Sequence, residues 1–288
     1  MLANINKLCV GTVQFGIPYG INNAVGIPSP NDIKEIFKIA KQAGIALLDT
    51  AYLYGDAETK IGELAEQKFT IVTKFSSVKN AEELTNELAI SLNRLKTTSL
   101  YGYLAHNADT LIENPDLWQT LQQAKENKQV EKIGYSLYST QQLEKLLDLN
   151  LIPDLVQLPY SLLDRKFEPF FPQLKQLGTE IHARSVFLQG LYYMDTLQLP
   201  TKLQDLKPNL REIQDCCKEY HVSIGALALN FAVTNPFIDK VVIGVDNPLQ
   251  LQQNTHAVQA WRQNEKLIDR INKIEVTNKE LLNPVNWK

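Results

Sequence analysis

Short apolar runs alternate with amphipathic stretches along nearly the whole chain. After most runs, apolar side chains recur every three or four positions, which is typical of a helix with one buried face. The runs themselves are only four or five residues long and read as strands. The pattern predicts strands at Lys7–Gly11, Ala46–Asp49, Thr70–Lys74, Leu100–Leu104, Lys132–Tyr135, Leu155–Leu158, Glu180–Ala183 and Val241–Gly244.

The first expected helix has signals at both ends. Ser29 is suited to cap it, Pro30 to occupy its first position and Gly44 to end it. Its apolar face comprises Ile33, Ile36, Phe37 and Ala40. Further helices are expected at Ala81–Leu95, Thr140–Leu149 and Ser223–Val233.

Repeated strand–helix units predict an α/β protein in which right-handed crossovers join parallel strands. About 250 residues is the usual size of a (β/α)8 TIM barrel. We therefore expect a single barrel domain over residues 1–288. A doubly wound open sheet is the alternative, but the segment 11–16 after the first strand lacks the G-x-G-x-x-G spacing that such a fold uses for phosphate.

Two long stretches lack a regular pattern and are expected to be loops. They are Gly16–Ser29, after the first strand, and Leu188–Pro208, after the seventh. In a barrel, both would overhang the face at which the strands end, a position suited to the rim of a substrate site.

The residues with the most reactive side chains follow the second, third and fourth strands. Asp49 and Tyr54 come after the second, Lys74 ends the third and His106 follows the fourth. In a parallel barrel these strand ends converge, so an acid, a phenol, an amine and an imidazole would meet. Each alone is better explained by a cap, a turn or a solvated strand end. Together they predict a site for proton transfer.

A carbonyl reduction would use these groups as follows. Tyr54 would donate the proton, and a neighbouring Lys74 ammonium would lower the pKa of its phenol. Asp49 would hold that ammonium in place, and His106 would hydrogen-bond the carbonyl oxygen. A Schiff-base role for Lys74 is the less favoured alternative, because Asp49 would keep the amine protonated.

Composition narrows the range of partners to small molecules. The formal net charge is −3, from 29 basic and 32 acidic residues mixed along the chain. With no basic stripe or polybasic tail, neither nucleic acid nor a membrane surface is expected as a partner. The N-terminal residues lack the pattern of a signal peptide, which favours the cytoplasm. We expect a monomer or a weak homo-oligomer.

No metal site is expected. Cys9, Cys216 and Cys217 lack the spacing of a zinc site or a disulfide framework and read as buried thiols in a reducing compartment. The histidines His182, His221 and His256 form no His-x-His or His-x-x-x-His pair.

Several motifs together resemble the aldo-keto reductase family. Asp49-Thr-Ala-x-x-Tyr54-Gly55 is similar to its signature around the acid and the tyrosine. Val72-Thr-Lys74 and Leu104-Ala-His106-Asn107 are similar to its lysine and histidine strands. The segment 242–254 is similar to its adenine-nucleotide segment. The resemblance runs from about Gly11 to Asn254 and implies an NAD(P)H-dependent reductase acting on an aldehyde or ketone.

The resemblance also implies where a nicotinamide dinucleotide lies. The nicotinamide end would meet Gly11, Thr12, Val13 and Asp49, with Ser136 and Gln157 at the carboxamide and Arg184 beside the ring. The loop after the seventh strand would wrap the pyrophosphate through Ser185, Leu188 and Gly190. The adenine end would meet Gly244, Val245, Asp246, Gln250 and Asn254, with backbone amides at the start of the last helix as an anion site.

Three positions depart from the family pattern. Leu137 stands where an asparagine usually helps to hold the carboxamide, and Arg184 where a tyrosine often stacks on the nicotinamide. A guanidinium can also stack. Asp246 lies in a segment where enzymes that favour NADPH place Lys or Arg. The family implies NADP(H), but a carboxylate repels a 2′-phosphate, so NAD(H) stays open as the cofactor.

The loop after the first strand and the run 184–191 resemble a bacterial branch associated with polysaccharide and sugar pathways, which implies a sugar or sugar derivative as one class of substrate. Aromatic residues expected at the pocket or in the core are Tyr19, Tyr52, Trp118, Tyr160, Phe187 and Tyr192. The alternative function is a cofactor-binding redox sensor or regulatory module with little turnover.

Overall fold

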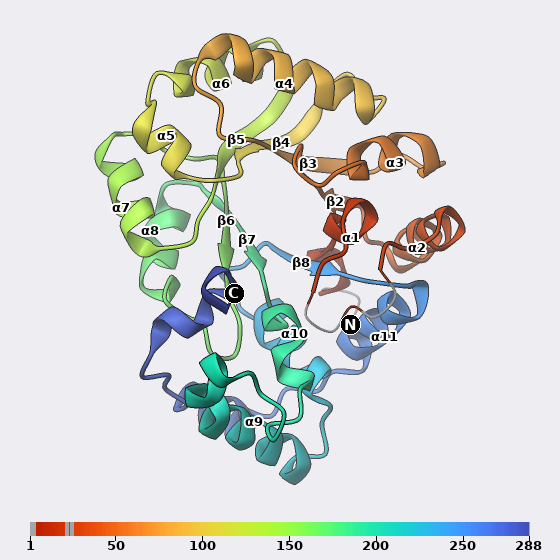
Figure 1. Ribbon diagram of the computed structural model, residues 1–288, viewed down its shortest axis with the longest axis vertical. Helices are drawn as coiled ribbons and strands as arrows, with labels where there is room; N and C mark the ends of the chain where they lie inside the picture. Colours follow the sequence, from red (N-terminus) through yellow and green to blue (C-terminus); the bar gives the residue numbers. More distant parts are fainter. Residues whose placement is uncertain (1–3, 21–22, 24–25, 288) are drawn as a thin grey trace.

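In the computed structural model, which describes residues 4–20, 23 and 26–287, eight parallel strands close into a barrel (Figure 1). The strands are β1 (Leu8–Gly11), β2 (Leu47–Asp49), β3 (Thr70–Phe75), β4 (Leu100–Ala105), β5 (Val130–Ser136), β6 (Leu155–Pro159), β7 (Glu180–Arg184) and β8 (Lys240–Gly244). Each pairs with the next along the chain, and β8 pairs with β1. The predicted (β/α)8 barrel is confirmed, and the open sheet is excluded.

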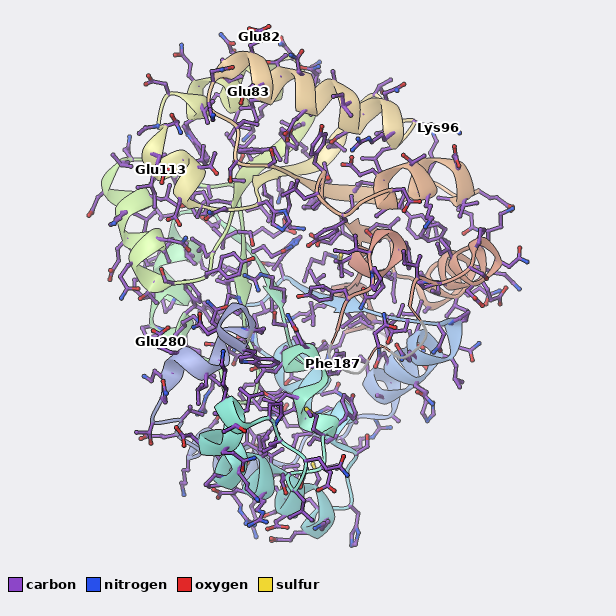
Figure 2. The ribbon with its side chains drawn as sticks, viewed as in Figure 1. Glu82, Glu83, Lys96, Glu113, Phe187 and Glu280 are labelled. Atoms are coloured by element: carbon purple, nitrogen blue, oxygen red, sulfur yellow. The ribbon has the colours of Figure 1, made fainter. Side chains whose placement is uncertain are left out.

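Helices surround the barrel. The larger ones are α2 (Pro30–Ala43), α3 (Ala57–Leu64), α4 (Ala81–Arg94), α6 (Leu117–Glu126), α7 (Thr140–Asp148), α9 (Lys207–Glu219), α10 (Ile224–Val233), α11 (Pro248–Ala260) and α12 (Glu265–Asn272). Shorter ones are α1 (Val13–Gly16), α5 (Asp109–Glu113) and α8 (Phe171–Gln176). In Figure 2, Glu82 and Glu83 lie at the upper edge of the view, over α4, and Phe187 lies nearer its centre.

Local sequence signals explain where α2 begins and ends. The Ser29 side chain accepts from the amide of Asp32, whose carboxylate accepts from Ser29 in return, and Pro30 is the first helical residue. Gly44 ends the helix with a φ of 83°, in the left-handed region that glycine adopts without strain. The helices predicted at Ala81–Leu95, Thr140–Leu149 and Ser223–Val233 are α4, α7 and α10, each within a residue of its predicted bounds.

Strand alternation places an apolar layer beneath a polar one inside the barrel. Cys9, Leu47, Val72, Leu104 and Leu155 form a buried cluster there. Because successive side chains of a strand point to opposite faces, the residues two positions further on face the same interior. In β1, β2, β3 and β6 these are Gly11, Asp49, Lys74 and Gln157. The predicted site residues therefore form the next layer, toward the carboxyl ends.

An ionic cluster lies at the opposite end of the barrel. The Glu180 carboxylate accepts from Tyr101 Oη at 2.6 Å, pairs with Lys132, and lies 2.7 Å from Nε2 of the buried His182. These partners hold the pKa of Glu180 below its ordinary value despite burial. His182 is thus buried and engaged by Glu180, one strand away from the predicted site residue Gln157.

The long loops only partly match the prediction. In its described residues the first is irregular from Ile17, but α1 precedes it and was not predicted. The prediction of an irregular Leu188–Pro208 is wrong in part. This stretch contains the 3-10 helices η3 (Leu188–Tyr193) and η4 (Thr201–Leu206) and reaches the start of α9. Buried leucines at 188, 191, 203 and 206 hold these turns against the core.

Shorter 3-10 turns lie elsewhere in the chain: η1 (Ile5–Lys7), η2 (Glu168–Phe170), η5 (Lys279–Leu282) and η6 (Pro284–Trp287). Within the residues that the structure describes, no helix is long and apolar enough to cross a membrane. The same residues contain no group of three or more His, Cys, Asp or Glu side chains arranged to hold a metal ion. Cys9 and Cys216 are buried free thiols.

Candidate active site

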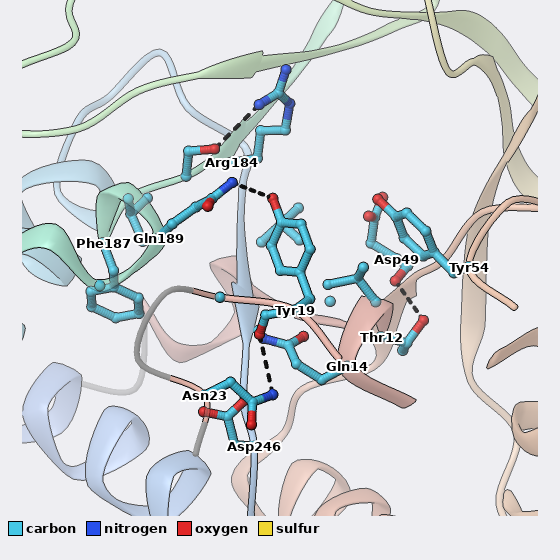
Figure 3. A pocket seen from close by; sticks show the side chains of 18 of the residues that line it. Thr12, Gln14, Tyr19, Asn23, Asp49, Tyr54, Arg184, Phe187, Gln189 and Asp246 are labelled. Atoms are coloured by element: carbon cyan, nitrogen blue, oxygen red, sulfur yellow. Dashed lines mark hydrogen bonds between the residues drawn. The ribbon is translucent and has the colours of Figure 1, made fainter. Parts of the chain in front are cut away.

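A cavity of about 530 Å³ opens where the strands end, the face at which barrels carry their reactive residues (Figure 3). Most of the predicted residues line it: Gly11, Thr12, Val13, Asp49, Tyr54, His106, Ser136, Gln157, Arg184, Ser185, Gly190, Gly244, Asp246, Gln250 and Asn254. Lys74 lies beneath the lining and is 1% exposed. The side chains of Leu188 and Val245 are buried outside it.

A buried ion pair forms the floor of the cavity. Lys74 Nζ donates to Asp49 Oδ1 at 2.7 Å and to the carbonyl oxygen of Thr50 at 2.8 Å. Gln157 Nε2 donates to the other carboxylate oxygen of Asp49, also at 2.7 Å. The backbone oxygen of Asp49 accepts from the amide and the hydroxyl of Thr12 (Figure 3). Neither charge is left unpaired, as a buried ion pair requires.

Two glycines hold Tyr54 in its place above this pair. A Cβ at Gly16 would lie 1.7 Å from the carbonyl oxygen of Tyr54, so only glycine lets the end of α1 approach so closely. Gly55 has a φ of 57° and turns the chain back toward Gly16. Lys60 Nζ, in α3, donates to the carbonyl oxygen of Phe15 at 2.7 Å and ties the same two segments together.

The phenol, the amine and the imidazole meet as predicted. The Tyr54 and His106 rings are 5.4 Å apart between centroids and meet edge to face at 84°. Lys74 Nζ lies 5.4 Å from the centroid of the Tyr54 ring. Three strand ends that are distant in the chain thus bring a phenol, an ammonium and an imidazole ring to one end of the cavity.

The expectation that Lys74 gives Tyr54 a lowered pKa is wrong in net direction. Burial raises the pKa of Tyr54, and the carboxylate of Asp49 adds to that rise, while the Lys74 ammonium lowers it. Lys74 acts in the expected sense, but its paired carboxylate cancels part of its field. Tyr54 therefore stays protonated at neutral pH.

Lys74 and His106 each hold a single protonation state at neutral pH. Burial lowers the pKa of Lys74, but Asp49 and Tyr54 outweigh it and the net direction is upward, so the amine stays charged. Burial, Lys74 and Arg184 lower the pKa of His106 to about 3, so its ring is neutral above pH 5. His106 Nδ1 is buried and, among the described residues, has no hydrogen-bond partner.

Arg184 makes an unpredicted contact. Its Nη2 donates to the carbonyl oxygen of Leu137 at 2.9 Å, its Nη1 to Ser185 Oγ at 3.2 Å, and its Cζ lies 4.4 Å from the centroid of the Tyr138 ring. Leu137, where the family pattern has an asparagine, is buried. Ser136 and Gln157 are the other residues expected at the carboxamide. The side-chain amide of Gln157 already donates one hydrogen bond to Asp49.

Unpartnered oxygen atoms lie at the far end of the cavity. Gln14 Oε1 and Asp246 Oδ1 are buried without a hydrogen-bond partner in the described chain. Gln14 lies against Gly244, where a Cβ would come within 2.4 Å of Gln14 Nε2. Two acceptors without donors at one end of a cavity suit a ligand that offers hydroxyl groups there.

The start of α11 is less open to anions than expected. The amide of Asp246 donates to Gln250 Oε1 at 2.8 Å, and the amide of Gln250 donates to Asn247 Oδ1 at 3.0 Å. Both amides thus already donate within the protein, so neither of these two is free to bind an anion.

A contact between the two long loops crosses the cavity. Gln189 Nε2 donates to Tyr19 Oη at 2.8 Å (Figure 3). On the side of β7, Ser185, Leu188 and Gln189 all have positive φ values, which side chains other than glycine rarely adopt. The turn is held in this shape by the buried side chain of Leu188 beneath it.

The aromatic residues divide between cavity and core. Tyr19 and Phe187 line the cavity. Tyr160, Tyr192 and Trp118 are buried in the core, and Tyr52 packs against Arg94. Gln14, Tyr138 and Gln189 also line the cavity and were not predicted from the sequence. Gln14 directly follows the predicted run 11–13, so a reading extended by one residue would have included it.

Comparisons with known proteins bear on this site and fold. A model described as the aldo/keto reductase family matches residues 7–276. The chain is 26% identical over 300 residues to YrpG of Bacillus subtilis strain 168, an uncharacterized oxidoreductase, and the match covers 88% of each sequence.

Two solved structures share the fold. The holo form of an aldo-keto reductase from Bacillus halodurans, AKR11C1, has a TM-score of 0.74 at 19% identity, over 93% of this chain and 91% of that one. The glycerol dehydrogenase AKR11B4 from Gluconobacter oxydans has a TM-score of 0.73 at 18% identity, over 96% and 93%. At such identities these two likenesses concern the fold alone.

Proposed function

The chain belongs to the aldo/keto reductase family of oxidoreductases, and from this premise we propose that it reduces an aldehyde or ketone to an alcohol with a nicotinamide dinucleotide, Tyr54 being the general acid. The observation that carries the proposal is the meeting of Tyr54, His106 and the Lys74–Asp49 pair at one end of a cavity large enough for a ligand.

Proton delivery follows from the protonation states. Tyr54 carries its proton at neutral pH, because burial raises its pKa. As the carbonyl oxygen gains negative charge it takes that proton, and the Lys74 ammonium, 5.4 Å from the ring centroid, stabilises the phenolate left behind. Asp49 keeps Lys74 charged and fixed. The neutral His106 offers a ring N–H to the same oxygen, so two donors meet the developing charge.

The cavity also suits the dinucleotide, which when bound supplies the hydride. Ser136 and the free oxygen of Gln157 would hold the carboxamide, beside Gly11, Thr12 and Val13. Ser185 and Gly190 would face the pyrophosphate, and Leu188 would shape that turn from behind. Gly244, Asp246, Gln250 and Asn254 would surround the adenosine, with Val245 buried beneath them.

The far end favours NAD(H) over NADP(H). Asp246 Oδ1 and Gln14 Oε1 are buried acceptors without donors, and ribose hydroxyls would supply them. A 2′-phosphate would bring negative charge to the same carboxylate. Among the described residues that line the cavity, no Lys or Arg lies close to Asp246 in the sequence, so no nearby cation offsets that repulsion.

The test is a titration of the protein with NADH and NADPH in parallel, followed by turnover with a panel of aldehydes that includes sugar aldehydes. We expect NADH to bind more tightly, and the preference to narrow or invert in Asp246→Asn, which keeps the size of the side chain and removes its charge. Carbonyl-dependent loss of reduced-nicotinamide absorbance should accompany binding. If neither dinucleotide binds, the proposal is overturned.

A redox sensor with little turnover is the second candidate. What favours it is the weakened carboxamide site, where Leu137 replaces a hydrogen-bonding residue and Gln157 is engaged with Asp49. Tight binding without turnover on any carbonyl would select it. A Schiff-base enzyme is disfavoured, because Lys74 lies outside the cavity lining and its pKa is raised.

A further inference from the structure

Arg184 brings a positive charge to the cavity. It ends β7, and no other Arg and no Lys lines the cavity within the described residues. Its two observed hydrogen bonds go to neutral acceptors, Ser185 Oγ and the carbonyl oxygen of Leu137, and its Nε is buried without a partner. The Asp164 carboxylate, which interacts electrostatically with Arg184, is paired with Lys166, and the Asp49 carboxylate of the cavity is paired with Lys74.

The position of this charge is fixed on two sides. The bond to Leu137 carries the side chain from β7 across β6 to the end of β5, and the Tyr138 ring, 4.4 Å from Cζ, holds the guanidinium as a cation–π partner. Leu137 directly follows Ser136, which pairs in register with Gln157. The guanidinium is therefore bonded to the residue that follows Ser136, and it lines the same cavity as Ser136 and Gln157, which the proposed function assigns to the nicotinamide carboxamide.

The charge also acts on the proton-transfer groups. Arg184 contributes, after burial and Lys74, to the lowered pKa of His106, and it opposes the rise in the pKa of Tyr54. Its field thus extends over the end of the cavity at which a carbonyl would react, and a nicotinamide placed there for hydride transfer lies within that field.

We propose that Arg184 tunes the redox balance of the bound nicotinamide, favouring its reduced form over its oxidised form. The inference rests on the proposed function, since it needs the carboxamide at Ser136 and Gln157. The oxidised ring carries a positive charge and the reduced ring carries none. A fixed guanidinium beside the ring therefore repels only the oxidised form.

The consequence concerns the direction of the reaction. In alcohol oxidation the substrate carbon gives a hydride to the oxidised ring, and the hydroxyl proton leaves by way of Tyr54, so that carbonyl and reduced dinucleotide form. A cation beside the ring shifts the balance between these bound pairs toward carbonyl and reduced dinucleotide. Arg184 thus adapts the site to oxidise alcohols more readily than it would without the charge.

The test is a substrate-free titration of the wild-type protein, Arg184→Gln and Arg184→Lys with NADH and with NAD⁺. We expect the ratio of the two Kd values, NAD⁺ over NADH, to fall about tenfold in Arg184→Gln, equivalent to about 30 mV in the potential of a two-electron couple. Arg184→Lys keeps the charge and should keep most of the ratio. A merely structural role would not separate the two cofactor forms.

Two results would overturn the inference while leaving the proposed function standing. One is an unchanged ratio in Arg184→Gln. The other is an equal weakening of both forms, which would assign Arg184 to the pyrophosphate or to the shape of the loop. If the wild-type protein binds neither NADH nor NAD⁺ nor NADPH, the proposed function and this inference fail together. Thermal unfolding of each variant shows whether the fold has been kept.

Discussion

Removing the Asp49 carboxylate beneath Tyr54 should destabilise the fold, because the buried ammonium of Lys74 then lacks its counter-charge. In Asp49→Asn, Lys74 Nζ keeps its hydrogen bond to the carbonyl oxygen of Thr50 at 2.8 Å but loses the carboxylate charge that lies 2.7 Å away in the wild-type protein. At an effective dielectric constant of about 20, that attraction is about 6 kcal/mol. The amine can escape part of the loss by folding in its neutral form, which from an ordinary pKa of about 10.4 costs about 4.6 kcal/mol at pH 7. We therefore expect the free energy of unfolding at pH 7 to fall by about 3–4.6 kcal/mol.

The pH dependence of this loss identifies its cause. In the wild-type protein the pKa of Lys74 is raised, so its contribution is complete below the unfolded pKa and is lost only as pH rises through the folded one, at strongly alkaline pH. In the variant, burial prevails and the folded pKa drops below the unfolded one. The free energy of unfolding of the variant should then rise by about 1.4 kcal/mol for each pH unit between 7 and 9.

Urea unfolding at pH 7, 8 and 9 measures the effect, and Asp49→Asn combined with Lys74→Met is the matched control. The double variant has no buried amine, so it should recover most of the stability and show no such pH trend. A loss for the single variant that is below about 1 kcal/mol at pH 7, or that stays constant to pH 9, would refute the reasoning that Lys74 is a buried charge held by Asp49.

Further predictions concern the proton donor and its loop. Because the pKa of His106 is about 3 and that of Tyr54 is raised, kcat/KM for carbonyl reduction should be flat from pH 6 to 9 and fall only where Tyr54 loses its proton; a pH–rate profile with an inflection near 6 to 7 would contradict this. Gly16→Ala, whose Cβ would lie 1.7 Å from Tyr54 O, should lower kcat/KM by about 100-fold, since displaced reacting groups lose about that much. Gly178→Ala is its control: that Cβ meets nothing within 4 Å, so its positive φ should lower Tm with kcat/KM unchanged.

The barrel could be predicted because its cause is local and repeated. Runs such as Leu155–Leu158 and caps such as Ser29 act through neighbouring residues, so they can be read without the rest of the chain. The meeting of Asp49, Tyr54, Lys74 and His106 followed from the barrel itself, because the strand ends of such a fold converge.

Other parts of the site depend on contacts between distant residues. The bond from Gln157 to Asp49 joins residues 108 positions apart, and the cation–π contact of Arg184 with Tyr138 joins the end of β7 to the loop after β5. The raised pKa of Tyr54 is the sum of burial and several opposed charges, and its direction could not be predicted from residue types. The turns in 188–206 depend on buried leucines that only the packed core explains.

The most direct test of the account is Tyr54→Phe, which removes one hydroxyl and keeps the ring that packs against His106. With a saturating aldehyde, kcat should fall by at least about 100-fold, the usual contribution of a placed general acid. The Kd for NADH, measured by fluorescence on the same preparation, should be unchanged. A variant that binds NADH normally and keeps the wild-type kcat would contradict the claim that Tyr54 delivers the proton.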